Sequence, residues 1–246
     1  NTLINHGHLF ENYLAIDPSL DWDNQKLLKE AKTKLQNTSF EGKSLFVSLS
    51  AASLDMQNSR ITMDNVMQDT TDYTLFARSI IEFSKFVESQ NQNGLNFSWK
   101  YYENDLHGTV PLISMRDALI FVFEWYQFKA FTKFNNPNTS TNELITLLKN
   151  REKTLLKHFT YPIAPMDEEQ LNMMGYMALQ FGQPEKSKAF FELNMEYYPK
   201  SANVYDAMAD YYEAQNDKVK ALKYVRKAFE ISGNDYHKKR IQDFKK

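Results

Sequence analysis

The sequence contains no cysteine, which excludes disulfide bonds, thiolate catalysis and cysteine-based zinc sites. Glycine is scarce, with 7 among 246 residues, and this favours helices over tightly turned sheets. Residues 118–126 form the longest apolar run, which includes Glu124 and is far too short to cross a bilayer, so we expect no membrane span. A net charge of −2 gives no electrostatic basis for nucleic-acid binding.

The first half of the sequence alternates strand-like and helix-like segments. Residues 44–50 (SLFVSLS) are the clearest strand, residues 96–102 alternate well enough to form another, and an apolar run over 13–16 ends in a turn at Asp17-Pro18. Three helical segments follow these strands in turn, at residues 23–35, 73–90 and 112–128. This alternation predicts an α/β sheet with parallel strands. Three strands are too few for a free-standing doubly wound sheet.

The last part of the sequence is helical and periodic. Pro199 and Gly233 lie 34 residues apart, and each closes a predicted helical hairpin. Small and large residues recur at the same spacing: Gly175 with Ala209, Ser187 with Ala221, Phe191 with Val225, and Leu171 with Tyr205. This period is typical of tetratricopeptide repeats, and the alternative is an ordinary four-helix segment with accidental spacing.

The domain organisation follows from these patterns. We expect an α/β domain at residues 1–130, a linker and connecting helix at 131–165, and tetratricopeptide-like repeats with a C-terminal capping helix at 166–246. Such repeats bind extended peptides in a concave face, or they brace a neighbouring domain. With two repeats, bracing is slightly favoured.

Two segments of the first half resemble the esterase-D-type esterases. They are residues 9–23 (LFENYLAIDPSLDWD) and 102–112 (YENDLHGTVPL), in that order. This family of α/β-hydrolases includes enterochelin and ferric-siderophore esterases, and some relatives carry appended tetratricopeptide repeats. The resemblance covers residues 1 to about 128. It implies the later half of an α/β-hydrolase domain, a small-molecule ester substrate, an exported bacterial protein, and no cofactor or metal.

His107 is the predicted catalytic base. It follows a terminal strand and precedes Gly108, so its imidazole can reach the carboxyl edge of the sheet, and the second family motif places the catalytic histidine here. A loop histidine bonded to backbone is the alternative. We expect polar or solvated helix roles for the other histidines, at positions 6, 8, 158 and 237.

The remaining site residues are less well defined by sequence. In α/β-hydrolases the triad acid follows the penultimate strand, and Asp55 is the nearest carboxylate after that strand here. Asp64 and Asp69 lie further along the same loop. A solvated or helix-capping role is equally compatible with Asp55. The first family motif borders the substrate, so Trp22 and Asp21 are predicted substrate contacts. At position 21 this sequence has an aspartate, whereas the family often has an aromatic residue at the equivalent position.

No G-x-S-x-G motif occurs in the sequence, so the nucleophile and the oxyanion loop of a serine hydrolase would lie upstream of Asn1. The sequence therefore predicts the C-terminal part of a serine-type carboxylic-ester hydrolase. The alternative is a non-catalytic scaffold in which the repeat tail binds a peptide or protein partner.

Overall fold

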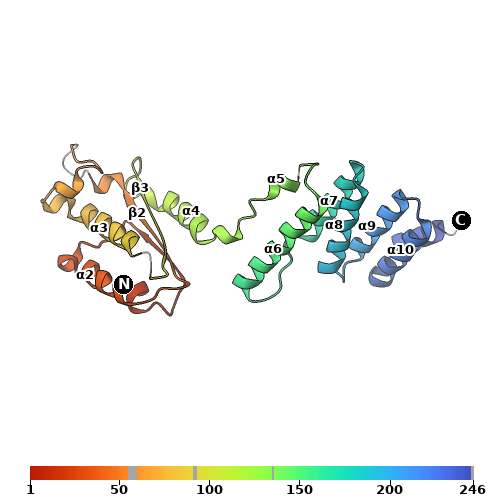
Figure 1. Cartoon of the computed structure of the whole chain (residues 1–246), viewed down its shortest axis with the longest axis horizontal. Coiled ribbons are helices and arrows are strands. Elements are labelled where there is room, and N and C mark those ends of the chain that lie inside the picture. The colour runs from red at the N-terminus through yellow and green to blue at the C-terminus, as the bar shows by residue number, and fades with distance from the viewer. Residues whose placement is uncertain (55–59, 91–92, 135, 245–246) are drawn as a thin grey trace. The chain divides into compact units, whose positions relative to one another are not determined.

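The computed structural model describes residues 1–54, 60–90, 93–134 and 136–244. The chain divides into two compact units, Asn1–Gln127 and Phe128–Lys246 (Figure 1). Within the described ranges, no helix combines the length and the apolar character needed to cross a membrane.

The first unit is built on a three-stranded sheet. Its strands are β1 (Asn12–Ile16), β2 (Ser44–Ser50) and β3 (Asn96–Tyr102), in the spatial order β1-β2-β3. Both pairs are parallel, which confirms the predicted strand direction. The central strand β2 is buried along its whole length, as its apolar sequence requires. All three strands therefore end at the same edge of the sheet.

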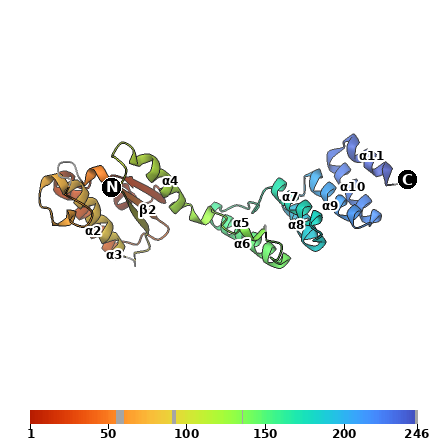
Figure 2. The same cartoon turned by 90° about the horizontal axis from the view of Figure 1, so that it is seen from above.

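Helices cover both faces of this sheet (Figures 1 and 2). Helices α2 (Trp22–Asn37) and α3 (Leu75–Ser89) pack on one face and bury the main apolar core. Helix α4 (Val110–Val122) lies against β2 and β1 on the other face. The short helix α1 (Thr2–Asn5) precedes β1.

Two predicted segments differ from the structure by more than a shift of one or two residues at an end. The helix predicted over 112–128 begins at Val110 and ends at Val122, and a 3₁₀ turn at Glu124–Tyr126 follows it. The described part of the predicted loop at 51–71 contains the 3₁₀ turns Ala51–Ser53 and Val66–Gln68. Short turns of this kind lack the hydrophobic period on which the prediction depended.

The described part of the second unit consists of helices and the loops that connect them. Its helices are α5 (Phe131–Phe134), α6 (Thr141–Phe159), α7 (Glu168–Gln180), α8 (Pro184–Tyr197), α9 (Ala202–Ala214), α10 (Lys218–Ser232) and α11 (Asp235–Asp243). Helix α7 packs on α8 and α9 on α10, and α8 also contacts α9, so the hairpins stack in chain order. Gly175 of α7 lets Phe191 of α8 approach so closely that an added Cβ would lie 2.3 Å from the ring.

Hydrogen bonds connect equivalent positions of successive hairpins. The hydroxyl of Tyr176 donates to Asp210 at 2.7 Å, and Nη1 of Arg240 donates to Asp206 at 2.6 Å; each pair is separated by 34 residues. His237 is 5% exposed, and its Nδ1 lies 2.7 Å from the Ser232 hydroxyl oxygen. The expectation of a solvated His237 is therefore wrong, because α11 packs its histidine against the preceding hairpin.

Candidate active site

Asp17 stands at the carboxyl end of β1. Its backbone N–H donates to the carbonyl of Ser48 at 3.1 Å, so the residue is still tied to β2 as the strand ends. Its φ is +42°, in the left-handed region that is uncommon for residues other than glycine. Backbone held in such a conformation is often found at functional sites. The Asp17 side chain is 1% exposed.

The buried carboxylate of Asp17 is held by Ser50, the last residue of β2. The Ser50 N–H donates to Oδ1 at 2.7 Å, and the Ser50 hydroxyl donates to Oδ2 at 2.6 Å. Burying a carboxylate is costly unless such donors replace water, and hydrogen bonds to a charged oxygen are among the stronger ones in proteins. These two bonds therefore fix the orientation of the Asp17 side chain.

His107 lies beside this carboxylate. Its Nδ1 atom is 3.0 Å from Oδ2 of Asp17, and its side chain is 73% exposed. The ring of Phe76 meets the imidazole edge to face, with ring centroids 6.4 Å apart. One side of the imidazole is thus held by the protein while the rest of the ring faces solvent.

The loop that carries His107 is itself ordered by hydrogen bonds. The Thr109 hydroxyl donates to Asp105 Oδ1 at 3.0 Å, and the N–H of Leu106 donates to the Thr109 hydroxyl oxygen at 3.0 Å. The Ala51 N–H donates to the Asp105 carbonyl at 3.1 Å, which ties the loop to the end of β2. The imidazole therefore starts from a fixed backbone at the carboxyl edge of the sheet.

The Asp17–His107 contact has a specific chemical consequence. A carboxylate that accepts the Nδ1 proton selects the imidazole tautomer in which Nε2 has a free lone pair. It also stabilises the imidazolium that forms when Nε2 takes a proton. This is the arrangement of the acid and base of a catalytic triad.

The structure brings His107 together with an acid that sequence reasoning missed. Asp55, the predicted acid, lies outside the described residues, so its role stays a prediction. Asp69, another candidate, accepts hydrogen bonds from the Thr71 N–H at 3.1 Å and the Thr71 hydroxyl at 2.8 Å, within its own loop. The sequence feature that could have identified Asp17 as a site residue is its position at the carboxyl end of a predicted strand.

The predicted substrate contacts lie on the segment that follows Asp17. Trp22 is 75% exposed, and one oxygen of Asp21, Oδ1, is buried without a hydrogen-bond partner among the described residues. Their roles as substrate contacts stay predictions. A buried oxygen with no partner is a costly feature that a bound donor would relieve.

An unusual backbone follows Trp22. Asp23, Asn24 and Gln25 have φ values of +51°, +52° and +60°, so the helix predicted from residue 23 opens with a left-handed turn. Such a turn costs roughly 1–2 kcal/mol per residue. The Gln25 side-chain amide offsets part of this cost by donating to the Ser79 hydroxyl at 2.8 Å. This turn fixes the start of α2, from which Trp22 projects.

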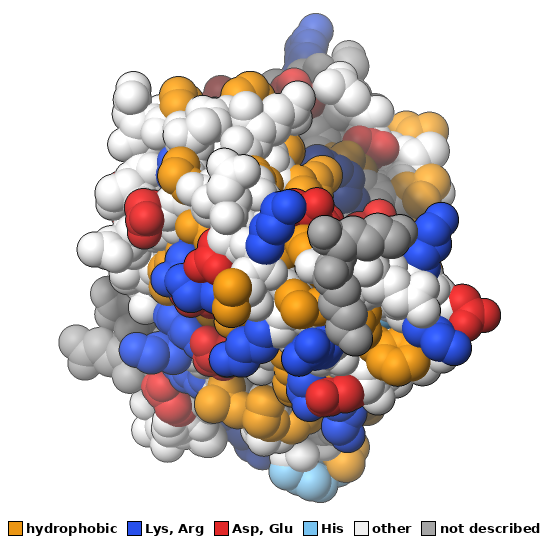
Figure 3. All heavy atoms as spheres, turned by 90° about the vertical axis from the view of Figure 1, so that its right-hand side faces the viewer, with side chains coloured by type: hydrophobic (Ala, Val, Ile, Leu, Met, Phe, Trp, Pro, Cys, Tyr) orange, Lys and Arg blue, Asp and Glu red, His pale blue; other side chains and the backbone are white. Residues whose placement is uncertain are grey.

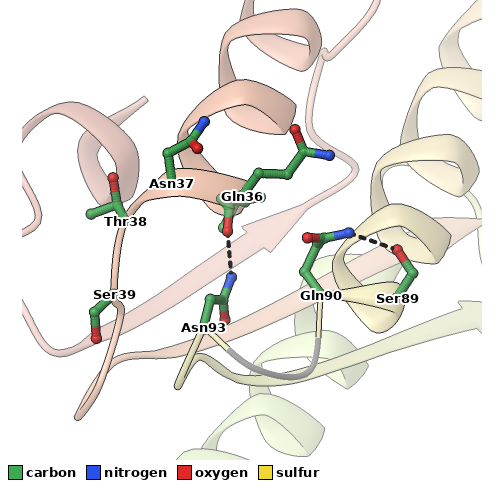
Figure 4. Close-up of a pocket in the computed structure, with 8 residues that line it drawn as sticks. Gln36, Asn37, Thr38, Ser39, Ser89, Gln90 and Asn93 are labelled. Atoms are coloured by element: carbon green, nitrogen blue, oxygen red, sulfur yellow. Dashed lines mark hydrogen bonds between the residues drawn. The ribbon is translucent and has the colours of Figure 1, made fainter.

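A separate hollow lies at the other end of the helices (Figure 4). It has a volume of about 550 Å³ and is lined mainly by amide and hydroxyl side chains near the C-terminal ends of α2 and α3. The Asn93 amide there donates to the Leu35 carbonyl at 3.1 Å. Its described lining residues include no acid, base or histidine, so this hollow does not compete with the Asp17 edge as a reaction site.

The clustering of metal-ligating side chains and the distribution of surface charge also bear on the function. Within the described ranges no three His, Asp or Glu side chains group as metal ligands would. On the face shown in Figure 3, basic side chains alternate with acidic and apolar ones. On α10, Lys227 and Glu230 form a salt bridge at 3.0 Å.

Comparisons with known proteins support the fold. The chain is similar to an IroE-like serine hydrolase from Shewanella oneidensis, with a TM-score of 0.51 and 18% identity over 80% of this chain. It is also similar to an uncharacterised protein from Capnocytophaga ochracea DSM 7271, with a TM-score of 0.57 and 18% identity over 96% of this chain. The chain spans 54% and 61% of the lengths of these two proteins. No family model and no curated protein matches the sequence. The chain thus shares part of its fold with an IroE-like serine hydrolase.

Proposed function

We propose that this chain carries the acid–base half of a serine-type carboxylic-ester hydrolase. The observation that carries the proposal is the 3.0 Å contact between His107 Nδ1 and Asp17 Oδ2. Because Nδ1 faces the carboxylate and the side chain is largely exposed, Nε2 is the nitrogen available for proton transfer. The family motif around His107 and the similarity in fold to a serine hydrolase support the same assignment.

The proposed reaction proceeds through an acyl-enzyme. His107 Nε2 takes the proton of a serine hydroxyl as its oxygen attacks the ester carbonyl, and then gives this proton to the departing alcohol. In the second half, His107 takes a proton from water, the hydroxide oxygen attacks the acyl carbon, and the serine leaves with the proton. Asp17 stabilises the imidazolium in both halves. The proposal requires a serine from a hydrolase segment outside this 246-residue sequence, because the sequence contains no G-x-S-x-G motif.

The test is ester hydrolysis by the complete product of the gene. We expect turnover of p-nitrophenyl acetate, and a loss of at least about 10³-fold in kcat in His107→Ala, since the base and acid are then missing. His8→Ala is the matched control because His8 is an exposed histidine of the same unit. Full activity in His107→Ala would disprove the assignment of the base, whereas no turnover by the unaltered complete product would favour a non-catalytic scaffold.

We further propose that the second unit is a tetratricopeptide-type tail that braces the protein. The contacts between residues 34 apart, Tyr176 with Asp210 and Asp206 with Arg240, are what a repeat of this period produces. These hydrogen bonds join one hairpin to the next, so the four side chains already have partners within the unit. The close packing of Gly175 on Phe191 supports the same interpretation.

A further inference from the structure

Asp21 carries a carboxylate that its own helix does not use. It stands at the N-cap position of α2, where an aspartate normally accepts a hydrogen bond from an amide of the first helical turn. Asp21 forms no such bond, and Asp23 and Asn24, which would supply the amides, have left-handed backbones. Its Oδ1 is buried and has no hydrogen-bond partner among the described residues. The half-buried carboxylate therefore lacks the donors that normally offset the loss of water.

The lysines nearest to Asp21 in the sequence bind other groups. Lys26 pairs with Asp23 at 3.5 Å, and Lys29 donates to a backbone carbonyl of the left-handed turn at 2.6 Å. The segment from residue 17 to residue 23 contains three aspartates and no basic side chain. A cation is the partner that such a carboxylate binds most strongly, because its hydrogen bonds are then assisted by charge.

Trp22, the next residue, supplies an exposed aromatic ring. It is 75% exposed, which is uncommon for a side chain of this size. Tyr73, three residues before Phe76 in the 3₁₀ turn that leads into α3, is 58% exposed. The faces of such rings carry partial negative charge and attract alkylammonium cations. A carboxylate that adjoins exposed rings is therefore suited to an organic ammonium group.

Helix α3 connects Asp21 to the His107 site. The Phe76 ring of α3 contacts the His107 imidazole, and Ser79 accepts from the Gln25 side chain at 2.8 Å. Residues three apart on a helix are neighbours, with Cβ atoms about 5–6 Å apart. The Gln25 N–H in turn donates to the Asp21 carbonyl at 3.2 Å. The start of α2 therefore lies within about one helical turn of the contact between Phe76 and His107.

A metal ion fits this place less well than an organic cation. Hard cations such as Ca²⁺ and Mg²⁺ take six or more oxygen ligands, whereas Asp21 offers one carboxylate beside an indole. In the part of the chain that the structure describes, no further His, Asp or Glu side chains complete such a set. An alkylammonium group needs only a carboxylate for its charge and an aromatic face for its methyl or methylene groups.

We propose that Asp21 and Trp22 bind a positively charged amino group of the ester substrate. This inference rests on the proposed function and names the class of substrate: esters whose acyl or alcohol part carries an ammonium or alkylammonium group. Asp21 balances the charge, and Trp22 contacts the carbon atoms around the nitrogen. Neither residue moves a proton. Both determine specificity, because they hold the ester beside the imidazole of His107.

The first experiment measures binding by this 246-residue chain without any reaction. Tetramethylammonium chloride is titrated against a sodium chloride reference of equal ionic strength, and the indole N–H signals are followed by NMR. The Trp22 signal, assigned through Trp22→Phe, should shift, and those of Trp99 and Trp125 should not. Asp21→Asn should raise Kd at least about tenfold, because the amide carries no charge. Asp23→Asn is the matched control on the same segment, since the Asp23 side chain is 69% exposed.

The second experiment measures hydrolysis by the complete product of the gene. Acetylcholine and its uncharged isostere 3,3-dimethylbutyl acetate differ only in the quaternary nitrogen, which is carbon in the isostere. We expect kcat/KM to be at least about tenfold higher for acetylcholine. Asp21→Asn should remove this preference and leave the hydrolysis of p-nitrophenyl acetate nearly unchanged. Asp23→Asn should keep the preference.

Three results would overturn the inference: a Trp22 signal that does not shift, an unchanged Kd in Asp21→Asn, and equal hydrolysis of the two isosteric esters. The two proposals fail in different ways. A shift of the Trp22 signal without hydrolysis of any ester, p-nitrophenyl acetate included, would disprove the proposed function and leave the ammonium site. Hydrolysis that depends on His107 but not on the charge of the ester would disprove the substrate class alone.

Discussion

The carboxylate of Asp17 lies 3.0 Å from Nδ1 of His107, although 90 residues separate them in the chain. The acid is almost completely buried and the base is mostly exposed. This asymmetry suits their proposed roles, because the acid is fixed by Ser50 while the imidazole is open to solvent. The pair is therefore built from the carboxyl ends of all three strands, with Asp17 after β1, Ser50 at the end of β2 and His107 in the loop after β3.

Asp17→Asn tests the pair. The amide has the shape of the carboxylate but can donate to Nδ1, which would shift the imidazole proton to Nε2 and remove the base. We expect kcat for p-nitrophenyl acetate in the complete product to fall on the order of 10²–10⁴-fold, with little change in KM. The measurement is steady-state kinetics near neutral pH.

The control for this variant is Asp23→Asn, because the Asp23 side chain is 69% exposed on the same segment. It should retain activity. If Asp17→Asn were fully active and Asp55→Asn inactive, the acid would be the residue that the strand order of α/β-hydrolases predicts, and Asp17 would have a structural role.

The sequence predicted the sheet better than the site. Residues 44–50 and 96–102 coincide with β2 and β3 because buried strands combine apolar content with clear turn boundaries. Asp17 escaped prediction because it follows β1, whereas the triad acid of α/β-hydrolases was expected after the penultimate strand. The left-handed turn at residues 23–25 is likewise set by tertiary contacts such as Gln25 with Ser79.

Asp117 should make the stability of the first unit depend on pH. Hydrogen bonds from Lys100 and then Tyr102 hold the pKa of the Asp117 carboxyl below its usual value. Its stabilising contribution is therefore present above the unfolded pKa of about 4 and is lost as the pH falls through the lower folded value. Asp117→Asn should reduce the free energy of unfolding by about 1 kcal/mol at pH 7.

The measurement is urea denaturation of the chain and the variant at pH 7 and pH 3, followed by a signal from the first unit. The difference between the two proteins should shrink at the lower pH. Asp64→Asn, at an exposed carboxylate, should show little difference at either pH. An equal loss at both pH values would mean that Asp117 acts through packing and not through its charge.

Gly175→Ala should destabilise the tail. A Cβ at this position would lie 2.3 Å from the Phe191 ring, which is fully buried. The gain in helix propensity, up to about 1 kcal/mol, is smaller than this overlap. We expect a net loss of about 1–3 kcal/mol in the free energy of unfolding of the second unit.

Thermal or urea unfolding measures this loss, and the double variant Gly175→Ala/Phe191→Leu should recover part of it. Gly108→Ala is the control, because nothing lies within 4 Å of a Cβ added there. A neutral Gly175→Ala would show that α7 and α8 are further apart than the structure places them.

Arg240 should determine whether the last helix stays packed. Its guanidinium donates to Asp206 and Asp210 at 2.6 Å each and to Glu213 at 2.9 Å. Burial raises the pKa of the Asp206 carboxyl, and the charge of Arg240 opposes that shift. Arg240→Met would therefore leave a mostly buried carboxylate without its main partner, and we expect the second unit to lose about 2–4 kcal/mol at pH 7.

The loss should be smaller at pH 5 than at pH 7, because a raised pKa lets the unpaired Asp206 take up a proton as the pH falls, and the neutral acid is cheaper to bury. Arg240→Lys keeps the charge but cannot bond several carboxylates at once, so its stability should be intermediate. Lys239→Met removes the exposed neighbouring charge and should change stability by less than about 0.5 kcal/mol. Urea denaturation of the three variants decides the matter: equal stability of Arg240→Met and Lys239→Met would show that α11 is held by apolar packing and not by this ion network.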